Sequence, residues 1–111
     1  MTTGEAVALI LALGGGGGGS KTETVSGSTP TITAEPNTLY ICGEVSTLSF
    51  TPAASGISEV IFESGSTPTV LTVPNTVIWP SWFDPTSLEA DTIYELSVAD
   101  GVYGVVCTWQ A

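Results

Sequence analysis

The stretch Thr92-Ile-Tyr-Glu-Leu-Ser-Val98, Ala99-Asp-Gly101, Val102-Tyr-Gly-Val-Val-Cys-Thr-Trp109 decides the fold class. Its two longer runs are rich in β-branched and aromatic residues, which favour strands. The Asp100-Gly101 pair between them is a strong signal for a tight hairpin turn, because both residue types tolerate a positive φ angle. The end of the sequence is therefore predicted to be two strands joined by a short turn.

The same pattern continues towards the N-terminus. Two of these runs, Ser58–Glu63 and Thr69–Val73, are expected to form a hairpin across a loop of about five residues. The other short strand candidates are Thr31–Thr33, Thr38–Cys42, Ser46–Phe50 and Thr76–Trp79. About seven short strands separated by frequent turn residues predict an all-β domain over residues 30–111, a small antiparallel β-sandwich or barrel-like fold.

A different composition precedes this domain. Thr2 and Glu5 fit a capping box, and the apolar run that follows suits about two turns of helix before Gly14. Residues 1–13 are predicted to be an N-terminal anchor helix, and residues 14–29 a flexible Gly/Ser-rich linker. Such a helix is apolar on every side and needs a partner to bury it. The anchor side chains are Val7, Leu9, Ile10, Leu11 and Leu13.

Three other interpretations of the opening segment compete with a docking anchor. A transmembrane helix needs roughly 20 apolar residues, and this run is much shorter. A secretory signal peptide begins with basic residues, whereas no Lys or Arg precedes Lys21. A simply disordered N-terminus is the third alternative. Docking on a partner, or on symmetry-related copies, is the favoured interpretation, which makes the chain a component of an assembly.

The charged residues of the chain disfavour several classes of function. One basic residue stands against eleven acidic ones, giving a net charge of −10 that disfavours nucleic acid and anionic membrane surfaces as partners. Without His or Arg, the usual general bases and activated nucleophiles are missing, so no catalytic residues are assigned and the chain is predicted not to be an enzyme. The scattered carboxylates are expected to be solvated surface charges. They are Glu44, Glu59, Glu63, Asp84, Glu89, Asp91, Glu95 and Asp100.

Metal and cofactor sites are not expected either. No stretch has the spacing of a calcium-binding EF-hand loop, and Cys42 and Cys107 lack the second pair that a structural zinc site requires. Both cysteines fall in predicted strands and are expected to be free thiols, although a disulfide remains open if their strands are neighbours. One faint internal echo joins Glu35-Pro-Asn-Thr-Leu-Tyr40 to Glu89-Ala-Asp-Thr-Ile-Tyr94. Two short matches are too few to predict a solenoid.

Two parts of the chain resemble a known family. The run from Asn75 to Glu95, together with Asp100–Trp109 and Asn37–Tyr40, is similar to a β-module at the C-terminal ends of structural and fibre proteins of tailed bacteriophages. The opening Gly4-Glu-Ala-Val-Ala-Leu-Ile-Leu-Ala-Leu-Gly-Gly15 resembles the N-termini of small phage head-fibre and capsid-decoration proteins. Fibres of this kind also carry a long shaft, which this chain lacks. The resemblance therefore implies a short head-associated protein, and a trimer.

The aromatic residues Trp79, Trp82 and Phe83 allow two interpretations. Exposed rings stack on sugars, so they could form a glycan-binding patch. The other interpretation, which is preferred, is that they plug one end of the sandwich as core residues.

Together these expectations describe a non-enzymatic virion structural protein on the capsid exterior, assembled in the host cytoplasm. Its expected partner is the major capsid protein or another virion protein, bound through the N-terminal helix. The missing Lys and Arg after Lys21 would also protect the displayed domain from trypsin-like proteases. The alternatives are a receptor- or glycan-binding adhesin module of a tail fibre and, less favoured because His and Arg are missing, a small secreted hydrolase.

Overall fold

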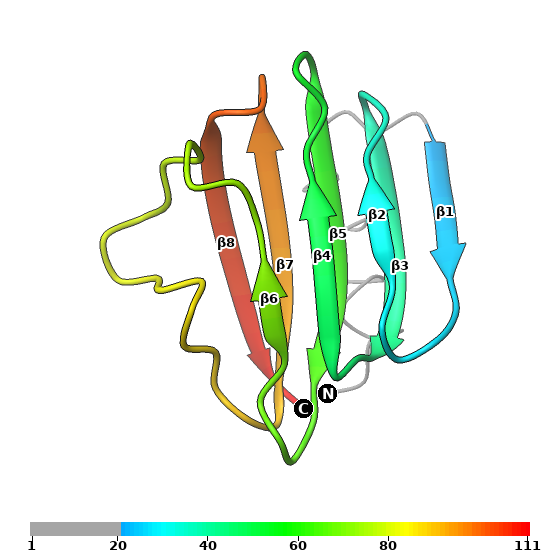
Figure 1. The fold of residues 1–111 in the computed structure, drawn as a ribbon, viewed down its shortest axis with the longest axis vertical. Helices are drawn as coiled ribbons and strands as arrows, with labels where there is room; N and C mark the ends of the chain where they lie inside the picture. The colour runs from blue at the N-terminus through cyan, green and yellow to red at the C-terminus, as the bar shows by residue number, and fades with distance from the viewer. Residues whose placement is uncertain (1–20) are drawn as a thin grey trace.

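The fold was analysed in a computed structural model that describes residues 21–111, and these residues form eight strands in two sheets (Figure 1). No helix occurs among them, and the predicted anchor helix and its five apolar side chains lie outside the described residues. The strands are β1 (Lys21–Val25), β2 (Thr31–Thr33), β3 (Thr38–Glu44), β4 (Thr47–Thr51), β5 (Ile57–Ser64), β6 (Val70–Thr72), β7 (Thr92–Ala99) and β8 (Tyr103–Gln110). The prediction of an all-β domain is confirmed.

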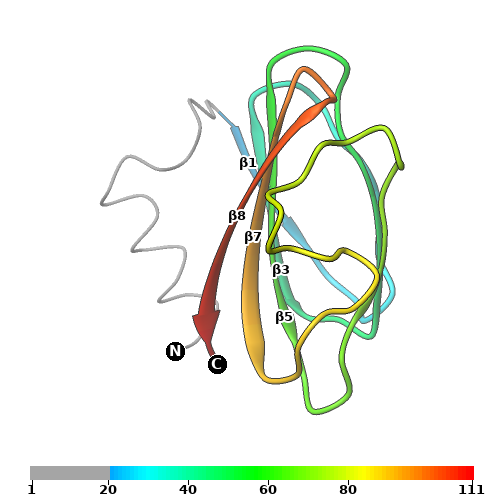
Figure 2. The ribbon, with the colours of Figure 1, turned by 90° about the vertical axis from the view of Figure 1, so that its left-hand side faces the viewer.

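The chain alternates between the two sheets for its first six strands. A large sheet has the order β1-β3-β5-β7-β8, and a small sheet has the order β2-β4-β6. Figure 2 shows the sheets edge-on as two layers. The pairs β1–β3, β3–β5, β2–β4 and β4–β6 are all parallel, and only β5–β7 and β7–β8 are antiparallel. The domain is therefore sandwich-like, but the expectation of antiparallel sheets is correct only for its last three strands.

The predicted hairpin between Ser58–Glu63 and Thr69–Val73 is wrong. The first run belongs to β5 in the large sheet and the second contains β6 in the small sheet, so the loop between them crosses from one layer to the other. Two hydrogen bonds fix this corner. The Thr69 N–H donates to Ser64 Oγ over 2.9 Å, and Thr69 Oγ1 donates to the Val45 carbonyl over 2.6 Å.

Strands β1 to β6 form three successive turns of a coil. In each turn the chain crosses from a strand of the large sheet to a strand of the small sheet. The sequence does not reveal these turns as a repeat, because the number of residues in each turn differs. Lys21 lies opposite Thr38 in the large sheet, and Thr38 lies opposite Ser58. Strand β1 also lies in the stretch that was expected to be linker, because its five residues pair along their whole length with β3. The two-sheet domain therefore already includes Lys21–Val25.

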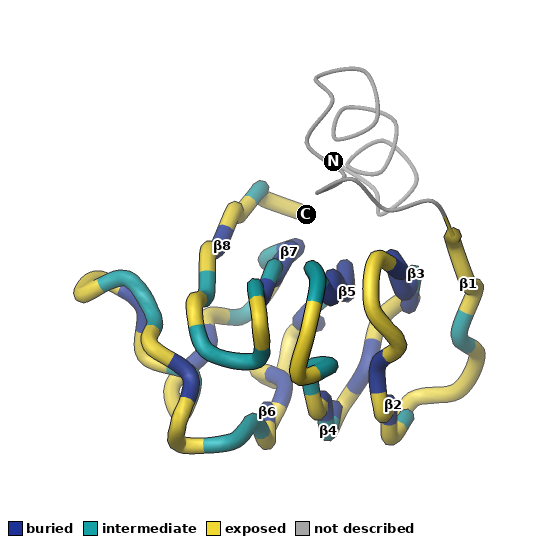
Figure 3. The backbone as a smooth tube through the Cα atoms, turned by 90° about the horizontal axis from the view of Figure 1, so that it is seen from above, coloured by how far each residue is buried: buried dark blue, intermediate teal, exposed yellow. Residues whose placement is uncertain are grey.

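The main core lies between the sheets. Side chains from both layers meet there with almost no solvent exposure. Figure 3 marks buried residues in dark blue along strands of both sheets. Its most deeply buried side chains include Phe50, Phe62, Leu48, Leu96, Val60 and Val98. A second cluster, Leu39, Ile61 and Ile93, lies on the opposite face of the large sheet, with Ile41 and Trp109 packed against it. The central strands are thus buried on both faces, as is usual for parallel sheets.

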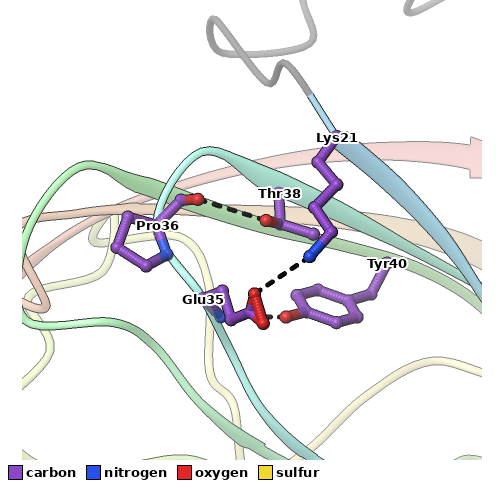
Figure 4. Close-up of polar contacts among 5 residues, drawn as sticks. All are labelled: Lys21, Glu35, Pro36, Thr38 and Tyr40. Atoms are coloured by element: carbon purple, nitrogen blue, oxygen red, sulfur yellow. Dashed lines mark hydrogen bonds and ion pairs between the residues drawn. The ribbon is translucent and has the colours of Figure 1, made fainter.

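The internal echo in the sequence corresponds to two turns with the same structure. In the first turn, which precedes β3, the Glu35 N–H donates to the Tyr40 hydroxyl over 2.8 Å (Figure 4). Thr38 Oγ1 donates to the Pro36 carbonyl over 3.1 Å, and Asn37 takes a φ of 54°. The buried tyrosine therefore ties the start of its own strand back to the preceding turn.

The second turn, which precedes β7, repeats each of these features. The Glu89 N–H donates to the Tyr94 hydroxyl over 2.8 Å, and Thr92 Oγ1 donates to the Ala90 carbonyl over 2.9 Å. Asp91 takes a φ of 53°, in the left-handed region that Asn and Asp enter more readily than most residues. A six-residue pattern therefore encodes one local structure at two places in the fold.

Candidate functional site

Within residues 21–111, the longest irregular segment runs through residues 73–91 between β6 and β7, and we call it the aromatic loop. The strand predicted over Thr76–Trp79 is reduced to a single bridge between Ile78 and Tyr103. The Ile78 N–H donates to the Val102 carbonyl over 2.7 Å, and the Gly104 N–H donates to the Ile78 carbonyl over 2.9 Å. These bonds attach the loop to the beginning of β8.

The three aromatic residues of the loop touch one another but differ in exposure. Phe83 packs edge-on against both tryptophans, with ring centroids 5.2 Å from Trp79 and 5.8 Å from Trp82. Phe83 is buried among core residues and lies 6.0 Å from the Tyr94 ring, and Trp79 is half-buried over Gly104. Trp82, in contrast, is 62% exposed. The core interpretation therefore holds for Phe83 and largely for Trp79, and the surface interpretation remains open for Trp82 alone.

A hollow of about 200 Å³ lies beside the exposed tryptophan. Its lining combines aromatic faces with two carboxylates and small hydroxyl side chains. The lining residues are Trp82, Phe83, Asp84, Ser87, Glu89, Tyr94 and Thr108. An aromatic face next to hydrogen-bonding groups suits a sugar ring, and the volume is below that of most sites for larger ligands.

Asp84 is held in place at the rim of this hollow. Its Oδ1 accepts hydrogen bonds from Thr86 Oγ1 over 2.6 Å and from the Thr86 N–H over 2.9 Å. Both bonds favour the charged form and lower the pKa of this carboxyl. The hollow therefore carries a fixed negative charge at neutral pH.

A second hollow of about 390 Å³ lies on the aromatic loop as well, and its character is different. Most of its lining is apolar or proline. It is formed by Leu71, Thr72, Val73, Pro74, Asn75, Val77, Trp79, Pro85 and Thr86. No carboxylate lines it, so it offers shape and apolar surface rather than groups for acid–base chemistry.

The structure also brings two buried carboxylates together on the face of the large sheet that carries the second apolar cluster, and sequence reasoning missed them. Glu59 on β5 and Glu95 on β7 are 0% and 3% exposed. The hydroxyl of Ser97 lies 2.6 Å from Glu95 Oε1 and 3.2 Å from Glu59 Oε2. A hydroxyl carries one proton and can donate to only one of them at a time. Glu59 Oε1 has no hydrogen-bond partner among the described residues.

This carboxylate pair holds a proton at neutral pH. Burial is the main reason that the pKa of Glu95 rises to about 8, and the neighbouring Glu59 charge raises it further against the effect of the Ser97 hydrogen bond. Burial also raises the pKa of Glu59, while hydrogen bonds from Glu95 and Ser97 act against that rise. The pKa of about 8 places this proton on Glu95.

The expectation that all these carboxylates are solvated is wrong for Glu59 and Glu95, and right for most of the others. Glu63 is half-buried. The exposed members are Glu44, Asp84, Glu89, Asp91 and Asp100. One signal in the sequence could have identified Glu59, since it directly precedes the apolar run Val60-Ile-Phe62 in the same strand. Neither buried carboxylate lines the hollows described above.

Within residues 21–111, no group of three or more His, Cys, Asp or Glu side chains is placed to hold a metal ion. Nor does that part of the chain contain a helix of the length and apolarity needed to cross a membrane. Comparisons with models of protein families, with curated proteins and with solved structures find no match for this chain.

Proposed function

We propose that this chain is a non-enzymatic structural protein of a bacteriophage particle, a capsid-attached decoration or short head fibre. The observation that carries the proposal is the contrast between two parts of the chain. Residues 21–111 form a two-sheet domain, and the sequence before them contains an apolar run that ends at Leu13 and is followed by six glycines. The resemblance of both parts to phage proteins supports the same assignment.

The surface of the domain suits display rather than chemistry. Lys21 is the single basic residue of the chain, and its ammonium group forms a 3.0 Å ion pair with Glu35 (Figure 4). All other charges are negative, so crowded copies repel one another and resist non-specific association. After residue 21 the sequence offers no cleavage site to trypsin-like proteases.

Attachment to particles tests the proposal. Residues 1–13 are deleted, and the amount of protein that copurifies with phage particles is measured by quantitative immunoblot. Burial of several large apolar side chains contributes roughly 1.5–3 kcal/mol each before the costs of association, so the deletion is expected to remove the protein from particles. The matched control, Trp82→Ala, changes the exposed domain and leaves attachment intact. Full retention of the truncated protein would refute the anchor.

The second candidate function is that of a receptor- or glycan-binding module, and the exposure of Trp82 beside Asp84 and Glu89 favours it. A glycan array with the full chain tests this function directly. Binding that is lost in Trp82→Ala but kept in Tyr103→Ala would establish the patch, because Tyr103 is equally exposed at 62% and lies outside the hollow. Loss of binding in both variants would point to general surface adhesion instead.

A further inference from the structure

Strand β8 leaves part of one side open at the edge of the large sheet. Its other side pairs with β7 along its whole length. The Ala111 N–H points to Asp91 on the β7 side, and the Gly104 N–H points to Ile78 on the opposite side. Because backbone groups alternate in direction along a strand, the N–H and C=O groups of Val106 and Thr108 also point away from β7. No residue in the described part of the chain forms a hydrogen bond with these groups.

Beyond the Ile78 bridge, the open edge has none of the features that normally prevent edge strands from pairing. Such strands are usually protected by charged residues, by proline or by bulges. The opposite edge strand of the large sheet, β1, contains Lys21 and Glu23. Strand β8 contains neither charge nor proline, and the last charged side chain before it is Asp100. This charge-free strand belongs to a chain with a net charge of −10.

An apolar stripe accompanies the open edge on the face of the large sheet that is turned away from the small sheet. Tyr103 and Val105 are 62% and 58% exposed. Cys107 is an exposed free thiol, and Trp109 is half-buried against the second apolar cluster. Backbone groups that can pair and apolar side chains that can pack are therefore present on one strand.

We propose that the open edge of β8 binds the same strand of a second copy, in antiparallel pairing about a two-fold axis at Cys107. A second copy is the occupant because it brings the same charge-free strand, so that contact between the two acidic chains places no like charges opposite each other. The Ile78 bridge fixes the register, since it occupies the edge beside Tyr103 and leaves residues 105–109, whose midpoint is Cys107. The two large sheets then become one continuous sheet.

The register can be checked against strand geometry. Val106 of each copy lies opposite Thr108 of the other, and each such pair exchanges two hydrogen bonds through its outward backbone groups. The two Cys107 residues face each other as a non-hydrogen-bonded pair, with Cα atoms about 4.5 Å apart, which is within the range of disulfides. Asp100 is seven residues from the axis, about 24 Å along the strand, so its charge is distant from its counterpart.

Oxidative cross-linking of the full-length chain tests the proposal. Burial, and then the neighbouring Glu95, raise the pKa of the Cys107 thiol, so spontaneous oxidation is slow and copper–phenanthroline is used as the oxidant. We expect a disulfide-linked dimer on a non-reducing gel that persists in Cys42→Ser and disappears in Cys107→Ser. Cys42 is the matched control because it is a buried free thiol.

Thr108→Pro distinguishes specific pairing from random collision. Proline removes an N–H that points away from β7, so the intramolecular ladder remains, whereas pairing with a second copy is blocked. Thermal unfolding verifies that the variant is folded. We expect its initial rate of cross-linking to fall at least fivefold. Equal rates in the wild type and this variant would overturn the proposal.

The position of the axis has its own test. In a Cys107→Ser background, Val105→Cys places the thiol opposite residue 109 of the other copy, and we expect cross-linking to fall to the level of Thr108→Pro. Efficient cross-linking through position 105 would refute the register. A monomeric mass of the wild-type chain at every concentration would refute pairing between copies and leave the edge to a strand of another protein.

Discussion

The buried hydroxyls of Tyr40 and Tyr94 show how a single atom stabilises a turn. Each accepts a hydrogen bond from the N–H of the glutamate five positions earlier, Glu35 and Glu89 respectively. These N–H groups precede the strand ladders and find no partner there. An N–H group without a partner in a partly buried turn costs free energy. Each tyrosine hydroxyl therefore contributes to stability in addition to the burial of the aromatic ring.

Replacing Tyr94 by Phe tests this contribution. The ring and its packing against Phe62 are retained, and the Glu89 N–H loses its acceptor. We expect the free energy of unfolding to fall by about 1–2 kcal/mol in urea denaturation. The control, Tyr103→Phe, removes a hydroxyl from an exposed ring and is expected to change stability by less than about 0.5 kcal/mol. Equal effects of the two substitutions would contradict the assigned role.

The carboxylate pair makes stability depend on pH in a defined direction. In the folded protein the pKa of Glu95 is about 8, above its usual value of 4.5, so the native state holds a proton that the unfolded chain releases. Stability is therefore fully present below about pH 4.5 and decreases as the pH rises towards 8. We expect Glu95→Gln to flatten this dependence and to stabilise the protein at pH 9 by on the order of 1–3 kcal/mol.

A matched substitution separates this effect from general charge repulsion. Glu44→Gln removes the same charge from an exposed position on β3 and is expected to leave the slope between pH 5 and pH 9 nearly unchanged. The measurement is the midpoint of thermal unfolding at each pH. If both variants flattened the curve equally, the dependence would come from the overall charge of the chain rather than from the carboxylate pair.

At the level of elements, the β7–β8 hairpin is also connected to the loop before β5. The Asp100 N–H donates to the Gly56 carbonyl over 2.9 Å, and Asp100 Oδ1 accepts from the Gly56 N–H over 3.2 Å. Gly101 takes a φ of 70°, and a Cβ at this position would lie 3.2 Å from the Ala53 carbonyl oxygen. The turn residues therefore set the hairpin and also its contact with the neighbouring loop.

Gly101→Ala tests this connection. The left-handed backbone and the close carbonyl both oppose a side chain, and we expect a loss of about 1–2 kcal/mol in the free energy of unfolding. Gly43→Ala is the control, because a Cβ there meets nothing within 4 Å. Chemical denaturation of both variants gives the comparison, and a neutral effect at Gly101 would mean that the turn adapts without cost.

These elements also show what the sequence could and could not predict. The β7–β8 hairpin was predictable because Asp100-Gly101 determines a turn between neighbouring strands. The pairing of β1 to β6 was not, because a short apolar run has the same appearance whether the next strand returns to its own sheet or crosses to the other. The carboxylate pair was missed for a related reason, since burial of Glu59 and Glu95 requires that both faces of the large sheet be covered. Only Trp82 of the proposed aromatic patch stays exposed.

For the whole molecule, the strong negative charge opposes self-association. The apolar helix predicted from the sequence of residues 1–13 would bury its surface most readily against identical copies, and the resemblance to phage fibres implies three of them. At an ionic strength of 0.01 M the screening length is about 30 Å, comparable to the domain, whereas at 0.15 M it is about 8 Å. Repulsion between neighbouring domains therefore extends across a trimer at low salt and only over short distances at physiological salt.

Light scattering across ionic strength tests the trimer. Full-length Thr108→Pro is used, so that pairing through β8 adds nothing to the mass. At 0.15 M salt we expect three times the chain mass of 11.3 kDa, with dissociation towards the monomer at 0.01 M because repulsion between the acidic domains is no longer screened. The same variant without residues 1–13 is expected to be monomeric at both salt concentrations. A full-length chain that is monomeric at every salt and protein concentration would contradict the trimer and restrict the anchor to a partner on the capsid.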